Sequence, residues 1–179
     1  MGGVTQAPSE GTPVVVAIHV AKGRRLPMRP TDRVHAEAGA GLVGDRYHGS
    51  KHRHVSAQSA TELEEAAARL GGPVPFEGTR RNLTLSHRTV PTRPGTRVKV
   101  GGALLEVVRK AAPCRILDDE IALGAARALH DRAGTILRVL ESGDIALGDT
   151  WVVIDGDAHA ERDHPADSPV PQPRPRRLP

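Results

Sequence analysis

The chain has 179 residues, a hydrophobic content of 38% and a formal net charge of +4, which fits one domain with its own core. Its only aromatic residues are Tyr47, Phe76 and Trp151, which argues against the stacking surface that binds single-stranded nucleic acid. A lone cysteine, Cys114, excludes an internal disulfide and any zinc or iron–sulfur site built from cysteines alone.

The two ends of the chain differ from its middle. Residues 1–12 and the proline- and arginine-rich residues 156–179 have few apolar anchors, so we expect them to be disordered and residues 13–155 to form one folded domain. No apolar run approaches the ~20 residues of a membrane-spanning helix. The first residues lack the pattern of a signal peptide, and we therefore expect a cytoplasmic protein.

Short segments rich in β-branched residues predict a fold made mainly of strands. The run 14–20 predicts a buried strand, and in 81–86 two leucines alternate with polar residues. Gly101 and Gly102 predict a two-residue hairpin turn, and residues 142–144 predict a second hairpin. The remaining strands are expected at 97–100, 103–109, 135–141, 145–149 and 150–154.

Two segments carry helix signals instead. One begins at Ser59, an N-cap candidate that Glu62 follows three residues later, and is expected to stop at Gly71. The segment 118–130 has acidic residues in its first turn and His130 near its end, which suits the helix dipole. Together the patterns predict a mainly β (α+β) fold, a mostly antiparallel β-barrel with inserted helices.

Positive charge is concentrated in residues 22–53, which contain eight Lys or Arg against three acidic residues. This imbalance suggests an anionic partner. Taken alone, however, it is explained better by a solvated basic surface, so the partner needs support from other signals. Gly44 and Gly49 allow the backbone to approach a ligand, and Lys51 and Arg53 supply charge. Nucleic-acid binding through this region is not favoured, because aromatic residues are sparse and no recognition-helix pattern is present.

Three histidines in the same region, His48, His52 and His54, offer zinc binding as a competing interpretation. No fourth ligand is evident for these three histidines, apart from Asp45 or the distant Cys114. Solvated histidines explain the pattern better.

Cys114 follows the strand expected at 103–109, with Arg109, Lys110 and Arg115 close to it in sequence. Positive neighbours stabilise the thiolate, which is the form that acts as a nucleophile or as a soft metal ligand. The alternative is an inert, buried cysteine that packs as a small apolar residue.

Arg80, Arg81 and Asn82 form a further cluster at the start of a strand. Guanidinium groups match the geometry of phosphate or carboxylate, and an amide can read the edge of a heterocycle. The alternative is a surface arginine pair, with Asn82 bonded within its own turn.

Four segments, taken in order, resemble the MOSC domain, the C-terminal domain of molybdenum cofactor sulfurase. They cover about residues 14–153 and read "GLVGDRYHG…HRHVSAQ", "RRNLTLS", "G…VKVGGALLEVVRKAAPC" and "RAGTILRVLESGDIALGDTWVV". The last departs from relatives that often have a Gly-Gly pair, because Ala133 precedes Gly134 here. The resemblance implies a β-rich barrel that binds the molybdenum cofactor, a pterin with a dithiolene and a phosphate.

The resemblance also implies roles for individual residues. Cys114 would ligate the metal, Arg80, Arg81 and Asn82 would hold the pterin or its phosphate, and the loop from Asp45 to Arg53, with Lys51 and Arg53, would complete the pocket. To these we add Arg115, next to Cys114, as a cofactor-binding candidate, and Asp45 and His48 as candidate proton donors.

Two functions follow from the resemblance. The first is reduction of small N-hydroxylated compounds, with electrons from a separate reductase. The second is a carrier of sulfur or cofactor without redox turnover, in which Cys114 would hold a persulfide supplied by a cysteine desulfurase.

Overall fold

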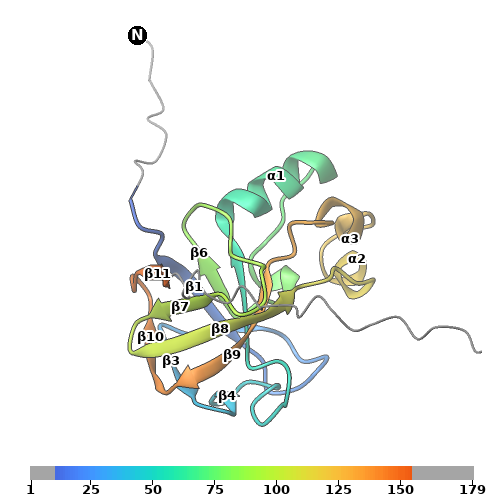
Figure 1. Ribbon diagram of the computed structural model, residues 1–179. Helices are drawn as coiled ribbons and strands as arrows, with labels where there is room; N and C mark the ends of the chain where they lie inside the picture. The colour runs from blue at the N-terminus through green and yellow to red at the C-terminus, as the bar shows by residue number, and fades with distance from the viewer. Residues whose placement is uncertain (1–10, 155–179) are drawn as a thin grey trace, which may run out of the picture.

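The computed structural model of the protein describes residues 11–154 (Figure 1). The ends that we expected to be disordered lie outside the described residues, apart from residues 11 and 12. The described part consists mainly of strands, with three α-helices gathered on one side of them (Figure 1). The prediction of a mainly β fold with inserted helices is therefore confirmed.

The elements follow one another as short units. The strands are β1 (Val15–Val20), β2 (Arg29–Pro30), β3 (Arg33–Glu37), β4 (Gly41–Leu42), β5 (Val55–Ser59), β6 (Leu83–Leu85), β7 (Arg97–Val100), β8 (Ala103–Lys110), β9 (Thr135–Glu141), β10 (Gly143–Ala146) and β11 (Trp151–Ile154). The helices are α1 (Ala60–Leu70), α2 (Ile116–Glu120), α3 (Ala125–Ala128) and the 3-10 helix η1 (Glu77–Thr79). None of the helices within residues 11–154 is long and apolar enough to cross a membrane.

The main sheet has eight strands in the order β11-β7-β8-β9-β5-β6-β1-β2, and a second sheet has the order β10-β3-β4. All pairs in the main sheet are antiparallel except β5 with β6. The order is open, so the strands do not close into the barrel that the sequence suggested. The segment before β1 nevertheless meets the start of β11, where the Trp151 amide donates to the Pro13 carbonyl at 2.7 Å.

Helix α1 carries the chain from β5 to its parallel neighbour β6, a connection that antiparallel hairpins cannot make. Its buried face packs with α2 and α3 in a separate apolar cluster that includes Leu63, Leu117 and Leu129. Gly71 ends the helix in the left-handed conformation, as expected, and its amide donates to Ala67. The expected side-chain cap is wrong, because Ser59 is the last residue of β5 and makes no capping hydrogen bond.

The single helix expected over 118–130 is two helices. Gly124 adopts φ +94° between α2 and α3, and this left-handed residue interrupts the helix. The Asp118 carboxylate then accepts hydrogen bonds from the amides of Gly124 and Ala126 and caps α3. Asp118, which suggested the start of a single helix, therefore caps the second helix, α3.

One of the two predicted hairpins is present. Gly101, at φ +54°, and Gly102 join β7 to β8, where Val100 pairs with Ala103. The hairpin at 142–144 is wrong, because β9 already pairs with β5 and β8 on its two edges. Strand β10 therefore crosses to the second sheet and pairs with β3.

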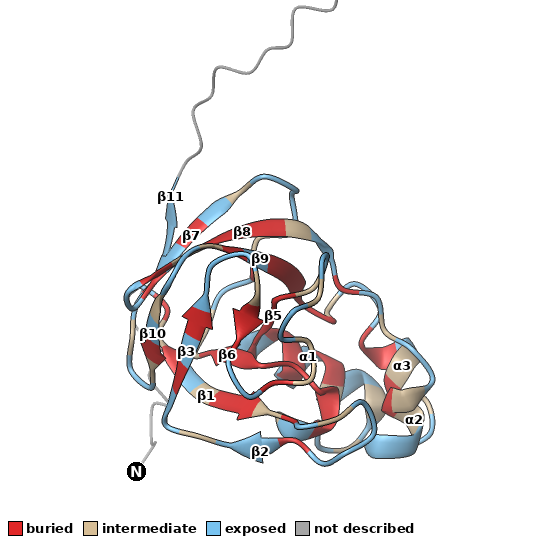
Figure 2. Cartoon of the chain, turned by 90° about the horizontal axis from the view of Figure 1, so that it is seen from below, coloured by how far each residue is buried: buried red, intermediate tan, exposed pale blue. Residues whose placement is uncertain are grey.

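The register of the main sheet brings four distant segments to one level. Lys110 pairs with Thr135, Thr135 with Ala57, and Ala57 with Leu83. Because β8 ends and β9 and β6 begin at this row, the residues that follow β8 lie close to those that precede β9 and β6. The strands themselves carry the buried aliphatic core (Figure 2).

Candidate functional site

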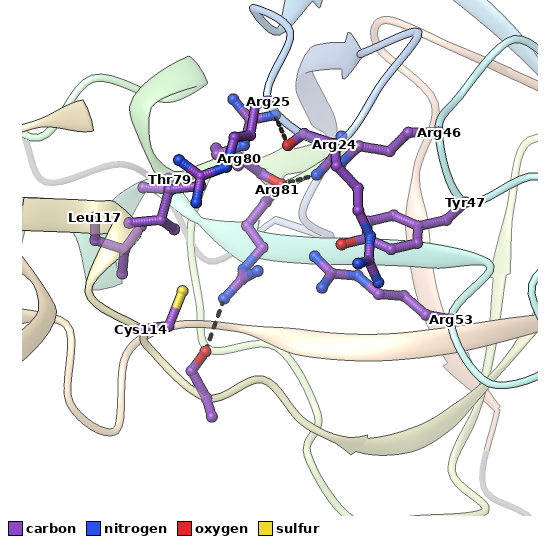
Figure 3. A pocket seen from close by; sticks show the side chains of 12 residues that line it. Arg24, Arg25, Arg46, Tyr47, Arg53, Thr79, Arg80, Arg81, Cys114 and Leu117 are labelled. Carbon is purple, nitrogen blue, oxygen red and sulfur yellow. Dashed lines mark hydrogen bonds between the residues drawn. The ribbon is translucent and has the colours of Figure 1, made fainter. Parts of the chain in front are cut away.

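A cavity of about 290 Å³ lies where these segments meet (Figure 3). Its volume is near the lower end of the ~300–1,000 Å³ typical of small-molecule sites. Six arginines contribute to the lining, and no acidic side chain from residues 11–154 does. The lining residues are Arg24, Arg25, Arg46, Tyr47, Arg53, Thr79, Arg80, Arg81, Ala112, Cys114, Ile116 and Leu117.

Cys114 lies on the segment between β8 and α2, and its side chain lines the pocket (Figure 3). The residue is exposed, so it is not the buried apolar cysteine of the alternative interpretation. Because the thiol is accessible and surrounded by cationic side chains, it can act as a nucleophile or as a metal ligand.

Arg81 forms part of the pocket wall and is only 6% exposed. Its Nε donates to the Ala133 carbonyl at 2.7 Å, and Nη2 approaches the Ala112 carbonyl at 3.5 Å. Burial, and after it the charge of Arg53, lower the pKa of Arg81 to about 10, while Cys114 acts in the opposite direction. Even so, Arg81 carries its charge at neutral pH.

Arg80 holds neighbouring segments together. Its backbone is left-handed, with φ +59°, and the residue is 5% exposed. Nη2 donates to the carbonyls of Arg24 and Leu26, both at 2.9 Å, while Nη1 pairs with Glu120 at 3.2 Å. Arg80 therefore ties the loop before β2 to helix α2.

Arg46 completes this set of tied side chains. Its Nη2 donates to the Arg80 carbonyl at 3.0 Å, and its Nη1 lies 3.3 Å from an oxygen of Asp45. We call Arg46, Arg80 and Arg81 the bound arginines, since each of their guanidinium groups donates to protein groups.

The other three arginines of the lining are Arg24, Arg25 and Arg53, which we call the free arginines. Within the described residues, none of their guanidinium groups has a hydrogen-bond or ion-pair partner. Nε of Arg53 is even buried without such a partner. The Arg53 guanidinium lies 4.1 Å from the centre of the Tyr47 ring. Burial lowers the pKa of Arg53. A ligand can therefore pair with these three groups without displacing a protein partner.

Asp45 and Asn82 lie beneath the lining and are almost fully buried. One Asp45 oxygen accepts from the Ala21 amide and from Asn82 Nδ2, both at 3.1 Å, and the other accepts from the Tyr47 amide. The Asn82 oxygen accepts from the amide and hydroxyl of Ser56. Both side chains thus hold the surrounding loops in place, and neither lines the pocket that they were expected to serve.

His48, Lys51 and Arg115 are exposed and also lie outside the lining. His48, a candidate proton donor, bonds instead to the Glu37 carboxylate at 2.8 Å. Of the expected site residues, the structure thus brings together Cys114, Arg53, Arg80 and Arg81.

The histidines of the same region do not form a metal site. His54 is buried, and its Nδ1 accepts from the Val139 amide at 3.0 Å. Among residues 11–154, no group of three or more His, Cys, Asp or Glu side chains is placed to hold a metal ion. The zinc interpretation is therefore wrong for the described part of the chain.

Sequence reasoning missed Arg24, Arg25, Arg46 and Tyr47 as individual lining residues. The signal for the arginines was the charge excess over 22–53, which located the region without selecting positions. Tyr47 carried only the signal of being the sole tyrosine.

The departure at Ala133 leaves the pocket intact. The Ala133 carbonyl accepts from Arg81, a contact that its methyl group does not obstruct. Gly134 is the position that needs glycine, because φ is +84° and a Cβ there would lie 2.0 Å from the Ala57 carbonyl oxygen.

Solved structures share this fold at low sequence identity. The YuaD protein from Bacillus subtilis aligns with a TM-score of 0.70 and 19% identity, covering 79% of this chain and 94% of that chain. YiiM from Geobacillus stearothermophilus gives 0.66 and 21%, covering 80% and 75%, and YiiM from Escherichia coli gives 0.62 and 17%, covering 82% and 71%. Comparison with curated proteins gave no match.

The family match is independent of these alignments. Residues 44–152, more than half of the chain, match the MOSC domain. This span runs from the loop that supplies Tyr47 and Arg53 to strand β11, and it contains Arg80, Arg81 and Cys114. The protein therefore belongs to the MOSC domain family.

Proposed function

We propose that the chain binds the molybdenum cofactor in the arginine-lined pocket, with Cys114 as the protein ligand of the metal, and reduces N-hydroxylated compounds there. One observation carries the proposal: an exposed cysteine sulfur shares a pocket with six arginines and with no acidic side chain of the described residues. A ligand that carries both a soft metal and a phosphate matches this combination.

The side chains present fit such a group. The buried Nε of Arg53 has no partner within residues 11–154, so an anion in the pocket would satisfy it. Arg24 and Arg25 are exposed at the pocket with unpaired guanidinium groups, which suit phosphate oxygens. The bound arginines fix the walls, since protein carbonyls and carboxylates already hold them.

When bound, the cofactor supplies two-electron redox chemistry at a metal centre. The protein's part is to hold it through Cys114 and the free arginines and to leave room for a small substrate beside the sulfur. The N-hydroxylated substrate class rests on the resemblance to MOSC reductases.

A separate reductase is part of the proposal. Gly39, Gly41 and Gly44 have the spacing of a dinucleotide-binding fingerprint, but Gly41 is the first residue of the two-residue strand β4 and the other two flank that strand. No helix follows them to hold a pyrophosphate at its N-terminus, as that fingerprint requires. We therefore assign electron delivery to another protein.

The test is metal content after expression in a host that makes the cofactor. Wild type is expected to contain molybdenum, and Cys114→Ala to lose most of it while unfolding at the same temperature. Lys51→Ala, an exposed change outside the lining, is the matched control and should keep wild-type metal. Equally negligible molybdenum in wild type and Cys114→Ala would refute the proposal.

A persulfide carrier is the second candidate, and the exposure of the Cys114 thiol favours it. In this function a cysteine desulfurase transfers sulfur to the thiolate, and the product is handed to an acceptor protein. Mass spectrometry after incubation with a desulfurase and cysteine would show one added sulfur, lost in Cys114→Ala. Turnover of hydroxylamine with an artificial electron donor and no added sulfur would instead support the reductase.

A further inference from the structure

The proposed reduction consumes protons, and few of the side chains that line the pocket can donate one. The two residues first considered, Asp45 and His48, lie outside the lining. Of the lining side chains, guanidinium groups keep their protons and Cys114 is assigned to the metal. The Thr79 hydroxyl donates to the Phe76 carbonyl at 2.7 Å and is thereby occupied. Tyr47 is the remaining lining residue with a transferable proton.

The surroundings of Tyr47 hold its ring in a defined place. The guanidinium groups of Arg46 and Arg53 lie 4.7 Å and 4.1 Å from its ring centre. Its amide donates to Asp45 at 3.1 Å, and its carbonyl accepts from the Ser50 amide at 2.9 Å. Ring and backbone are therefore both restrained.

The hydroxyl of Tyr47 is directed toward the interior of the pocket, toward Arg81 and Arg53 (Figure 3). Within the described residues it has no hydrogen-bond partner, unlike the carboxylate of Asp45 and the ring of His48. A pocket-facing phenol without a protein partner is free to donate to a bound ligand.

We propose that Tyr47 is the general acid that protonates the oxygen leaving the substrate nitrogen, an inference that rests on the proposed function. With hydroxylamine the balance is NH2OH + 2e⁻ + 2H⁺ → NH3 + H2O, and a partner reductase provides the two electrons. The N–O bond breaks, Tyr47 gives one proton to the departing oxygen, and water gives the second proton to nitrogen. The phenolate lies between the guanidinium groups of Arg46 and Arg53, which stabilise it until solvent reprotonates it.

Tyr47→Phe is the direct test, since it removes the hydroxyl and retains the ring between the two arginines. In molybdenum-loaded protein with hydroxylamine and an artificial donor, we expect kcat to fall by about 100-fold. Molybdenum content and KM are expected to stay near wild type.

His48→Gln serves as the control, because His48 is a neighbouring titratable residue outside the lining, and its kcat should be unchanged. If Tyr47→Phe keeps wild-type kcat while Cys114→Ala has none, the role of Tyr47 is refuted and the proposed function stands. If wild type neither holds molybdenum nor turns over hydroxylamine, both are refuted.

A second readout does not depend on turnover. Tyr47 is the only tyrosine and Trp151 the only tryptophan, so near-ultraviolet difference spectra separate the two positions. Hydroxylamine is expected to perturb the tyrosine band and to leave the band of Trp151, which is 3% exposed, unchanged. An unperturbed tyrosine band at hydroxylamine concentrations that saturate turnover would overturn the assignment.

Discussion

The bound and the free arginines line the same pocket and differ in what occupies their guanidinium groups. Arg46, Arg80 and Arg81 donate to carbonyls and carboxylates of the protein. Arg24, Arg25 and Arg53 have no such partners among residues 11–154. The bound set therefore builds the pocket, and the free set is available to a ligand.

The two sets are connected through the backbone. Arg80 donates to the carbonyls of Arg24 and Leu26, so a bound arginine positions the loop that presents two free ones. Arg46 in turn donates to the Arg80 carbonyl. Changes in the bound set should therefore lower stability, whereas changes in the free set should lower ligand affinity alone.

The largest effect is expected beneath the bound arginines, at Asn82. Asn82→Ala leaves the buried Ser56 amide and the Asp45 carboxylate short of partners, which should cost about 3 kcal/mol in the free energy of unfolding. Urea unfolding measures it. The exposed control Lys51→Ala should stay within about 0.5 kcal/mol of wild type, and equal losses in the two variants would contradict the role of the network.

A smaller loss is expected for Arg80→Met, which removes two bonds to the loop and the ion pair with Glu120. We expect about 2 kcal/mol in unfolding free energy and faster hydrogen exchange in residues 22–28. Glu120→Gln removes only the partly exposed ion pair, so its loss should be below about 1 kcal/mol. A larger loss in Glu120→Gln than in Arg80→Met would mean that the ion pair, and not the loop contact, matters.

The free arginines should show the opposite pattern. Arg24→Gln and Arg25→Gln should each weaken binding of inorganic phosphate roughly tenfold, the equivalent of ~1.4 kcal/mol, with the unfolding midpoint unchanged. Calorimetric titration at low salt measures the affinity. Arg115→Gln, an exposed change outside the lining, should not weaken binding, and a similar loss there would indicate general charge attraction instead of a site.

Features that depend on residues close together in the sequence could be predicted, and features that depend on distant residues could not. The Gly101-Gly102 hairpin was predictable because the turn and its pairing are local. The hairpin at 142–144 was not, since β9 is paired on both edges by strands far away in the sequence. The break between α2 and α3 depends on the conformation of Gly124 and on the Asp118 cap, which helix periodicity does not reveal.

The candidate site shows the same division. Cys114, Arg80 and Arg81 were identifiable from their residue types and order, and the row through Lys110, Thr135, Ala57 and Leu83 brings their segments together. Their partners were not identifiable, because the carbonyls that hold Arg80 are more than fifty positions away. The same limit made Asn82 a candidate ligand when its amide is fully used by buried neighbours.

The smallest effect concerns His54, a buried base that contrasts with the buried, charged Arg81. Burial lowers the pKa of His54 from its ordinary value of 6.5. Below pH 6.5 the unfolded chain binds a proton that the folded chain resists, so this part of the stability is complete above that pH and decreases as the pH falls. His54→Gln, which keeps an acceptor for the Val139 amide, should therefore lose less stability than wild type on acidification. Identical pH profiles of unfolding free energy would contradict this.

The most direct measurement of the central claim is the position of the metal in a crystal of the molybdenum-loaded protein, located by anomalous scattering at the molybdenum edge. The account predicts one metal site bonded to the Cys114 sulfur, within the cavity that the arginines line. Metal bound elsewhere on the protein, with the Cys114 thiol unligated, would contradict it.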